Sequence, residues 1–268
     1  MRLQVIVVIR FSYLAEIGFR LSRQGLDTVR ATLYDSTRLE RRFQLFEALT
    51  LPSLLGQTDP DFTLAVLIGE DFPAEFRVRL EQMIAPLHDA RLVALPPYNN
   101  YRSTKLAIES CRKDSATHLL TLRLDDDDAL GRDVIEAQKR IAPVVAGVGP
   151  EDAPAVICFN NGLFLELSES GNRLYGVIEK LPLGIGMGMI APVGARPTIF
   201  STDHRRVHTR WNTYTEALTP RFIRTVHRDN DSGAVASGEQ FDIPPDEIEA
   251  ILQRHFLHDS ATLLGLPA

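Results

Sequence analysis

The segment His118–Asp128, HLLTLRLDDDD, sets a mostly apolar run directly before four consecutive aspartates. An apolar run of this kind predicts a strand that is buried in a sheet. In open α/β sheets, ligands bind at the carboxyl ends of the strands, which is where the aspartates would stand. The segment therefore predicts both the type of sheet and the position of a binding site.

The chain before this segment alternates between strand and helix patterns. Strands are predicted at Leu3–Ile9 (LQVIVVI), Phe62–Ile68 (FTLAVLI) and Ala90–Leu95. Helices are predicted from an apolar stripe at Leu39, Phe43, Phe46 and Leu49, at Pro73–Leu87 and Ser103–Cys111, and after the aspartates at Asp133–Val145. This alternation indicates an α/β fold with a parallel sheet and right-handed crossovers.

The pattern changes near residues 149–154, which we interpret as a seam within one domain of residues 1–268. Strands are predicted at Ala155–Phe159, Gly162–Glu166 and Arg221–His227, and a C-terminal helix follows Pro244-Pro245. The segment Leu183–Val193 is rich in Gly and Met. It lacks the context of a dinucleotide fingerprint, and we expect either a mobile loop over the site or a tightly packed connection.

Composition excludes several classes of protein. The chain has 268 residues, 44% of them hydrophobic, and a net charge of −6, which argues against broad nucleic-acid binding. Cys111 and Cys158 form no metal-binding or disulfide pattern, so a reducing, cytoplasmic location is expected. The apolar run Met1–Ile9 is too short to span a membrane. We expect no transmembrane segment, and peripheral membrane contact stays open.

Four adjacent carboxylates repel one another, so burying them requires a cation or protonation. Mg²⁺ or Mn²⁺ takes carboxylate oxygens and leaves positions for phosphate oxygens. Alternate residues of an extended segment point to opposite sides, so the run cannot face one metal in full. One or two aspartates are expected on the metal and one on a ligand hydroxyl. The alternative is a solvated acidic turn that caps the helix beginning near Asp133.

Ordered motifs along the chain resemble a known family. Ser53–Thr58 (SLLGQT) followed by Asp61-Phe62 is similar to the first helix and second strand of family-two glycosyltransferases of the GT-A type, and Thr117–Leu130 is similar to their strand that ends in Asp-x-Asp. The chain also resembles the bacterial rhamnosyltransferase branch of this superfamily, in the segments Arg10-Phe11, Arg42-Phe43, Leu51–Ser53, Tyr101-Arg102 and Leu124–Leu130. The resemblance covers residues 1–145 best.

The resemblance implies a GT-A fold, in which a Rossmann-like, mostly parallel sheet has helices on both faces and a smaller mixed region on the acceptor side. Residues 1–148 would hold a nucleotide-sugar and a metal, and residues 149–268 the acceptor and the C-terminal helix. It also implies a metal-dependent glycosyltransferase that moves a sugar, with rhamnose as the candidate, from a nucleotide-sugar to a hydroxyl of a saccharide or other acceptor in cell-surface polysaccharide synthesis.

Roles carried over by position fall into two groups. Asp125 and Asp127 match the two aspartates of the Asp-x-Asp motif. Asp126 stands at the variable position between them, and Asp128 matches the additional acidic residue that often follows. The implied metal ligands are Asp127, Asp128 and His227, with His204 as a second choice for the histidine. The implied donor-binding residues are Arg10, Asp71, Arg102, Lys105, Asp125 and Asp126.

The general base is the weakest part of the pattern. The family often has a Glu-Asp pair on the acceptor side, and this sequence has none at the expected distance. Asp203 is the predicted catalytic residue, with Glu216 and His208 as alternatives. Asp203 also fits the ordinary role of a turn or cap residue.

Other classes of protein could use the same carboxylates. A sugar-activating nucleotidyltransferase would be expected to have a Gly-rich basic loop after the first strand, whereas no glycine stands between Arg10 and Gly18. A phosphohydrolase with an aspartyl nucleophile would place its motif after the first strand. A non-catalytic nucleotide-sugar-binding module also fits, because no clear base is present.

Overall fold

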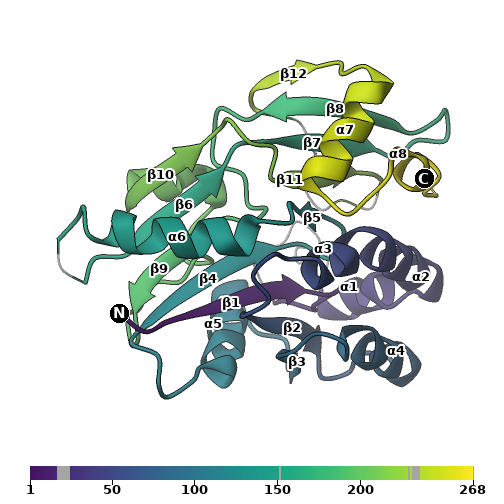
Figure 1. Cartoon of the computed structure of the whole chain (residues 1–268). Coiled ribbons are helices and arrows are strands. Elements are labelled where there is room, and N and C mark those ends of the chain that lie inside the picture. The colour runs from purple at the N-terminus through teal and green to yellow at the C-terminus, as the bar shows by residue number, and fades with distance from the viewer. Residues whose placement is uncertain (17–24, 151, 229, 231–235, 268) are drawn as a thin grey trace.

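The computed structural model describes residues 1–268 apart from 17–24, 151, 229, 231–235 and 268. Its larger sheet has seven strands in the order β10-β6-β9-β4-β1-β2-β3 (Figure 1). Their bounds are β1 (Leu3–Arg10), β2 (Thr63–Gly69), β3 (Ala90–Leu95), β4 (His118–Leu124), β6 (Ala155–Phe159), β9 (Gly188–Pro192) and β10 (Asn212–Glu216). All neighbours are parallel except β9, which runs antiparallel to both β4 and β6.

Helices cover both faces of this sheet, as the sequence predicts. Alternate residues of β1 enter two separate cores, because its side chains point to opposite faces. One core packs against α2 (Ser36–Leu45), α4 (Ala74–Ile84) and α6 (Val134–Ala146), and the other against α5 (Asn100–Cys111) and a 3₁₀ helix (His204–Thr209). A π-helical turn (Phe46–Thr50) and α3 (Leu51–Leu55) also contribute to the first core, whereas the buried residues of α1 (Leu26–Leu33) form a small separate cluster with Leu14.

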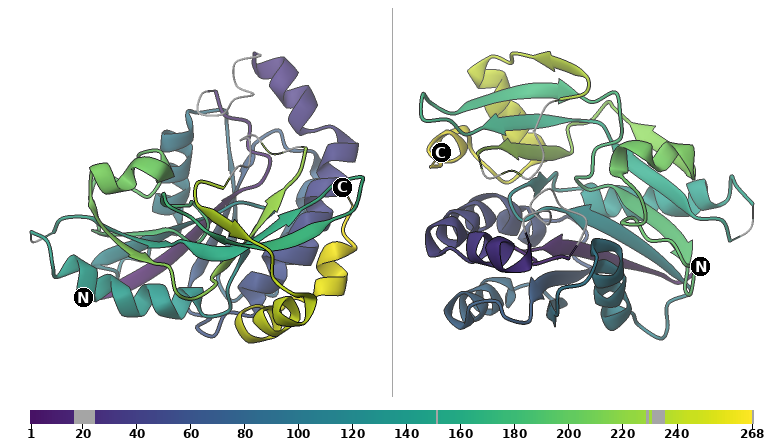
Figure 2. Two further views of the ribbon diagram at one scale, coloured as in Figure 1. Left: turned by 90° about the horizontal axis from the view of Figure 1, so that it is seen from above. Right: turned by 180° about the vertical axis from the view of Figure 1, so that it is seen from behind.

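A second, mixed sheet lies beside the first (Figure 2). It has the strand order β12-β8-β7-β11-β5 and consists of β5 (Ala129–Leu130), β7 (Asn161–Glu166), β8 (Arg173–Ile178), β11 (Phe222–Val226) and β12 (Glu239–Phe241). Helix α7 (Pro245–His255) packs its apolar stripe on this sheet, and α8 (Ser260–Leu264) joins the same core. The four aspartates Asp125–Asp128, called the acidic run below, lie between β4 of the large sheet and β5 of the small one. The acidic run therefore crosses from one sheet to the other.

Of the two alternatives for Leu183–Val193, a mobile loop is wrong for the second half of the segment, and tight packing is what the structure shows there. Residues Gly188–Pro192 form β9, which pairs with two strands in the interior of the large sheet. A Cβ atom on Gly188 would stand 2.6 Å from the Gln138 side chain of α6, so the glycine permits close packing of helix on strand. The run is a packed strand because Met187 and Met189 are buried in the core.

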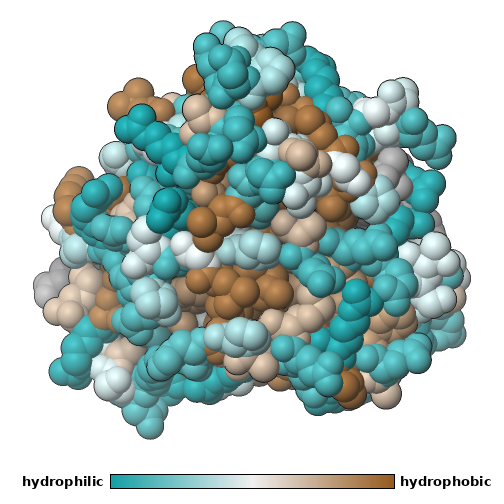
Figure 3. All heavy atoms as spheres, turned by 45° about the vertical axis from the view of Figure 1, so that its right-hand side comes forward, coloured by the Kyte–Doolittle hydropathy of each residue, from teal (hydrophilic) through white to brown (hydrophobic). Residues whose placement is uncertain are grey.

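The surface on the side of α2 and α8 is mainly hydrophilic, with a brown apolar area in its centre (Figure 3). Leu55 and Leu257 are each 48% exposed. A Cβ atom on Gly56 would collide with Leu257, so the C-terminal segment rests directly on the end of α3. Within the described ranges, no helix is long and apolar enough to cross a membrane.

Candidate functional site

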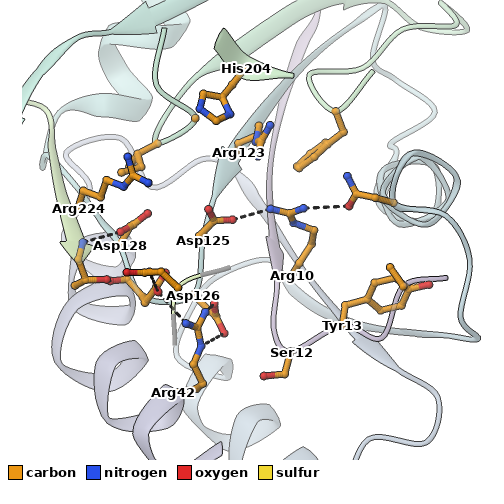
Figure 4. Close-up of a pocket in the computed structure, with 18 of the residues that line it drawn as sticks. Arg10, Ser12, Tyr13, Arg42, Arg123, Asp125, Asp126, Asp128, His204 and Arg224 are labelled. Atoms are coloured by element: carbon orange, nitrogen blue, oxygen red, sulfur yellow. Dashed lines mark hydrogen bonds and ion pairs between the residues drawn. The ribbon is translucent and has the colours of Figure 1, made fainter. Parts of the chain in front are cut away.

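A pocket of about 680 Å³ opens at the carboxyl ends of β1 and β4. All four aspartates of the run line it, together with arginines from β1, α2, β4 and β11 (Figure 4). The polar and charged part of its wall comprises Arg10, Ser12, Arg38, Arg42, Asn99, Asn100, Arg123, Asp125, Asp126, Asp127, Asp128, Thr202, Asp203, His204, Arg224, Thr225 and Asn230.

Arg10 and Asp125 meet because β1 and β4 are parallel neighbours. Ile9 and Leu124 are in register, so the residues that follow them lie side by side. An Arg10 Nη atom lies 2.8 Å from an Asp125 carboxylate oxygen, and the same guanidinium donates to Asn100 at 3.1 Å. Burial opposes ionisation of Asp125, but Arg10 and Arg123 outweigh it and lower its pKa. Both residues line the pocket, and their contact with a donor stays a prediction.

Asp126 is held within the protein by Arg42 of α2. The guanidinium makes a two-point contact with both carboxylate oxygens of Asp126, one of them at 3.1 Å from Nε, and its other Nη donates to Asp127 at 2.8 Å. Asp126 is 1% exposed. The structure thus assigns its carboxylate an internal partner, whereas the resemblance implied a contact with the donor.

Arg42 was given no role from the sequence. A signal was present, because Arg42 stands next to Phe43 and three residues after Leu39 in the apolar stripe of a helix. A charged side chain at such a position is seldom fully buried unless it is paired. Arg123, the one charged residue inside the otherwise apolar run of β4, gave a second signal of the same kind.

Asp127 and His227 lie together, which is the pairing that the resemblance implies. His227 Nε2 lies 2.8 Å from Asp127 Oδ2, and Asn230 donates to the same oxygen at 3.3 Å. Burial opposes ionisation of Asp127, but Arg42 and His227 outweigh it and hold its pKa well below the usual range. Asp127 is therefore anionic at neutral pH.

Asp128 behaves in the opposite way. Burial, with the charges of Asp127 and Asp125, raises its pKa well above the usual range, and Arg224 only partly offsets this. One carboxylate oxygen accepts the Thr225 backbone N–H at 2.9 Å. Asp128 is therefore the most easily protonated of the carboxyl groups of Asp125, Asp127 and Asp128.

These carboxylates fit a hard divalent cation by their chemistry. Asp125, Asp127 and Asp128 each keep one oxygen with no hydrogen-bond partner in the described part of the chain. The raised pKa of Asp128 marks a carboxyl group that an added cation would ionise. Among the residues that the structure describes, no three His, Cys, Asp or Glu side chains already converge as a metal cluster. Side-chain rotation would be needed to bring the oxygens together.

Asp203 and His204 form the opposite wall of the pocket. Asp203 Oδ1 accepts the Arg205 backbone N–H at 2.9 Å and caps the 3₁₀ helix, which is the ordinary cap role that its residue type allows. His204 Nδ1 lies 3.6 Å from the same oxygen. Burial and the neighbouring Arg123 lower the pKa of His204 to about 4, so its imidazole is neutral at physiological pH.

The alternative base candidates lie away from the pocket wall. Glu216 accepts from Arg221 at 3.0 Å and from the Leu218 backbone N–H at 2.6 Å, so both of its oxygens have structural partners. His208 lies on the exposed side of the 3₁₀ helix. Neither residue is among those that line the pocket.

Three predicted donor contacts also lie outside the pocket wall. Asp71 accepts from Arg30 at 2.5 Å and from the Tyr34 hydroxyl at 3.1 Å, which turns its carboxylate toward the C-terminal end of α1. The Arg102 guanidinium stacks 3.9 Å over the Tyr98 ring. Lys105 lies further along α5 and does not line the pocket. The roles of these residues stay predictions.

The doubly covered, mostly parallel sheet, the smaller mixed sheet and the acidic run at the carboxyl edge define a glycosyltransferase fold of the GT-A class. A family model described as "Putative rhamnosyl transferase" matches residues 4–239. The chain belongs to this family. No curated protein matches it.

Several solved structures are similar in fold. S. aureus TarS residues 1–349 in complex with UDP-GlcNAc is 11% identical, with a TM-score of 0.45, over 95% of this chain and 65% of that one. S. aureus TarS is 10% identical, with a TM-score of 0.43, over 84% of this chain and 37% of that one. A protein from Desulfovibrio desulfuricans G20 described as a "putative nucleotide-diphospho-sugar transferase" is 9% identical, with a TM-score of 0.36, over 83% of this chain and 80% of that one. The chain spans 37% to 65% of the TarS chains.

Proposed function

We propose that this protein is a divalent-metal-dependent glycosyltransferase that uses a nucleotide-sugar donor, and that the sugar is rhamnose. The observation that carries the proposal is the pocket at the ends of β1 and β4, in which an acidic run faces several arginines. Family membership supports sugar transfer. The name of the family alone suggests rhamnose.

The pocket suits a nucleoside diphosphate in size and charge. Its volume of about 680 Å³ is within the usual range for small-molecule sites. Arg10, Arg123 and Arg224 line it from three different strands. Guanidinium groups recognise phosphate oxygens through two parallel hydrogen bonds, so these side chains can orient a diphosphate.

Asp127 and Asp128, with His227 beside Asp127, are the residues that would hold Mg²⁺ or Mn²⁺. The bound metal would offset the charge of the departing nucleoside diphosphate. In this proposal Asp125 contacts the nucleotide-sugar donor and not the metal, because its neighbour Arg10 can reach the same donor. Asp126 and Arg42 hold the loop that carries these groups.

The acceptor is proposed to enter on the side of Asp203 and His204. Its hydroxyl oxygen forms a bond to the anomeric carbon, while the bond from that carbon to the diphosphate oxygen breaks and the electron pair leaves with the diphosphate. The hydroxyl proton passes to a base on this wall, for which Asp203 is the carboxylate that the sequence offers. By resemblance, the acceptor belongs to cell-surface polysaccharide.

Calorimetric titration with UDP-, GDP- and dTDP-sugars, each with and without Mn²⁺, tests the proposal. At least one donor should bind about tenfold more tightly with the metal, which is about 1.4 kcal/mol. If every donor binds equally with and without Mn²⁺, or none binds at all, the proposed function is wrong.

A further inference from the structure

His204 occupies a position that the sequence did not connect with proton transfer. It lines the pocket together with Thr202 and Asp203, and its side chain is 27% exposed. Figure 4 shows its ring above Arg123, on the opposite side of Asp125 from Arg42. The imidazole is therefore part of the pocket wall near Arg123 and Asp125.

We propose that His204 accepts the proton of the acceptor hydroxyl and that Asp203 is a positioning residue for its ring. The inference rests on the proposed function and changes one part of it, because the base becomes the imidazole in place of the carboxylate. Nothing else in the proposed sugar transfer is altered.

The contacts of Asp203 argue against it as the base. Its Oδ1 is used to cap the 3₁₀ helix through the Arg205 N–H at 2.9 Å. Its side chain is 58% exposed, so water solvates the carboxylate. A carboxylate that is hydrated and caps a helix serves to hold its neighbours in place. Asp203 Oδ1 lies 3.6 Å from His204 Nδ1, so this carboxylate favours the imidazole orientation in which Nδ1 is turned toward Asp203.

The contacts of His204 leave its other nitrogen available. Nδ1 faces Asp203, and in the described part of the chain no hydrogen bond is made by Nε2. A neutral imidazole with its proton on Nδ1 has the lone pair on Nε2, which can accept a proton. The pocket wall thus presents a proton acceptor beside the place proposed for the acceptor hydroxyl.

Four charged groups face this imidazole. Arg123 comes from β4 and Asp125 follows it, while Asp203 and Arg205 belong to the segment of His204 itself. Burial is the largest cause of its low pKa, followed by Arg123, and the two aspartates act in the opposite direction. The histidine is therefore kept neutral in the protein without a ligand.

Donor binding should increase the basicity of His204. A nucleoside diphosphate placed beside Arg10 and Arg123 brings negative charge that offsets the charge of Arg123. A base is most effective when its pKa is near the working pH, so a rise on donor binding favours catalysis in the filled site. The same charge stabilises the imidazolium that forms.

Proton transfer to His204 accompanies the exchange of bonds at the sugar. The acceptor oxygen bonds to the anomeric carbon and gives its proton to Nε2 of His204. The carbon–oxygen bond to the diphosphate breaks, and its electron pair leaves with the nucleoside diphosphate. The imidazolium, which faces the Asp203 carboxylate, then returns its proton to solvent.

The first test is an NMR titration of the histidine ring signals, assigned with His204→Gln. It is done with and without Mg²⁺ and the nucleoside diphosphate of whichever donor binds in the calorimetric series. The pKa of His204 is expected to rise by about one pH unit or more when the diphosphate binds, in line with one nearby opposite charge. An unchanged pKa in the filled site would overturn the inference.

The second test compares His204→Gln, Asp203→Asn and the control His208→Gln, an exposed histidine on the same 3₁₀ helix. The rate is the release of nucleoside diphosphate with water as the acceptor. His204→Gln should lower it by about 10²-fold or more while donor affinity is kept, as expected for loss of a general base. His208→Gln should match the parent protein.

The pH profile separates positioning from catalysis. Because the charge of Asp203 raises the pKa of His204, Asp203→Asn should shift the acidic limb of the rate profile to lower pH and keep most of the plateau rate. A full rate in His204→Gln, or an equal loss in Asp203→Asn, would overturn the assignment. If the donor binds and reacts normally in His204→Gln, only this inference fails; if no donor binds the parent protein, the proposed function fails too.

Discussion

Arg42 supplies the positive charge that lets two adjacent aspartates stay buried. Its guanidinium contacts Asp126 at two points and Asp127 at 2.8 Å. Repulsion alone predicted from the sequence that four buried carboxylates need a cation or protonation. The structure provides part of the charge from arginines, so the metal proposed for this site would offset the charge of Asp128 and of the diphosphate and not that of the whole run.

Replacing Arg42 by Met should therefore be strongly destabilising. Removing one partner of a buried ion pair leaves uncompensated charge and typically costs about 3–5 kcal/mol. Urea denaturation followed by circular dichroism measures the loss. Arg77→Ala is the matched control, since its exposed pair with Glu81 should contribute no more than about 0.5 kcal/mol. Equal losses in the two variants would contradict the structural role of Arg42.

Replacing Asp128 by Asn should stabilise the metal-free protein, and more so at higher pH. The pKa of Asp128 is raised on folding, so its contribution to stability is present below the unfolded value and is lost as the pH rises. Asn removes this cost, which is about 1.4 kcal/mol for each pH unit by which folding raises the pKa, and its side-chain oxygen can still accept from Thr225. Unfolding in EDTA between pH 4 and pH 8 measures the difference. A difference independent of pH would count against the raised pKa.

At the scale of single residues, sequence reasoning predicted that the aspartates and His227 lie together, but it did not predict their internal partners. The run Asp125–Asp128 and His227 could be predicted because strand-end position and residue type are local signals. The partners of Arg42 could not be predicted, because its contacts join positions that are 84 and 85 residues apart on different elements. The carboxylate of Asp71 points elsewhere than expected for the same reason, since Arg30 and Tyr34 reach it only in the folded chain.

The connection between α3 and α6 shows what the Ser53–Thr58 motif does in the structure. The Gln57 side chain donates to Ser53 O at 2.7 Å and Gly131 O at 2.9 Å, and it accepts the Ile135 N–H at 3.0 Å. Thr58 N donates to Arg132 O at 2.7 Å. These bonds fix the segment that follows the acidic run, so the motif supports the site from outside the pocket wall.

Gln57→Met tests this connection. The substitution keeps the volume but leaves the Gly131 carbonyl and the Ile135 N–H without their partner, and each such buried group costs about 1–3 kcal/mol. The expected loss is about 2–6 kcal/mol in chemical denaturation, which is the sum for two such groups. Thr58→Val, which removes a hydroxyl bonded to Glu136 near the surface, should lose less than half as much. A larger loss in Thr58→Val would show that the interior bonds of Gln57 are not the main connection.

Strand β9 marks the limit of element prediction from this sequence. Apolar runs such as β1 and β2 were predicted to within a residue or two of their ends. Glycines at 184, 186 and 188 made Leu183–Val193 resemble a loop, because glycine is ordinarily unfavourable in strands. Gly188 is instead required where α6 packs against the strand.

The two sheets share one site because the acidic run joins them. β4 of the large sheet leads directly into the aspartates, and β5, which follows them, pairs with β11 of the small sheet. The seam near residues 149–154 does not divide the sheets, since β6, β9 and β10 beyond it belong to the large one. Local sequence patterns predicted the alternating strands and helices of the first half well. The strand order of the second half depends on pairing between distant segments, which local patterns do not show.

The two cysteines report on the integrity of the whole fold. Cys111 and Cys158 are both fully buried, and burial raises the pKa of the Cys158 thiol to about 12. Thiolates, not thiols, react with disulfide reagents, so the native protein should be nearly inert to DTNB and react at both thiols in urea. The thiol reaction should follow the same urea curve as circular dichroism. Rapid reaction of either cysteine without denaturant would contradict this core.

The central claim is that the acidic run binds a donor together with a divalent metal, and Asp127→Ala tests it most directly. The measurement is the ratio of donor dissociation constants in EDTA and in Mn²⁺, with the exposed Asp114→Ala as the control. The parent protein and Asp114→Ala should show a ratio of about ten or more, equivalent to about 1.4 kcal/mol, and Asp127→Ala a ratio near one. A ratio in Asp127→Ala equal to that of the parent would contradict the claim.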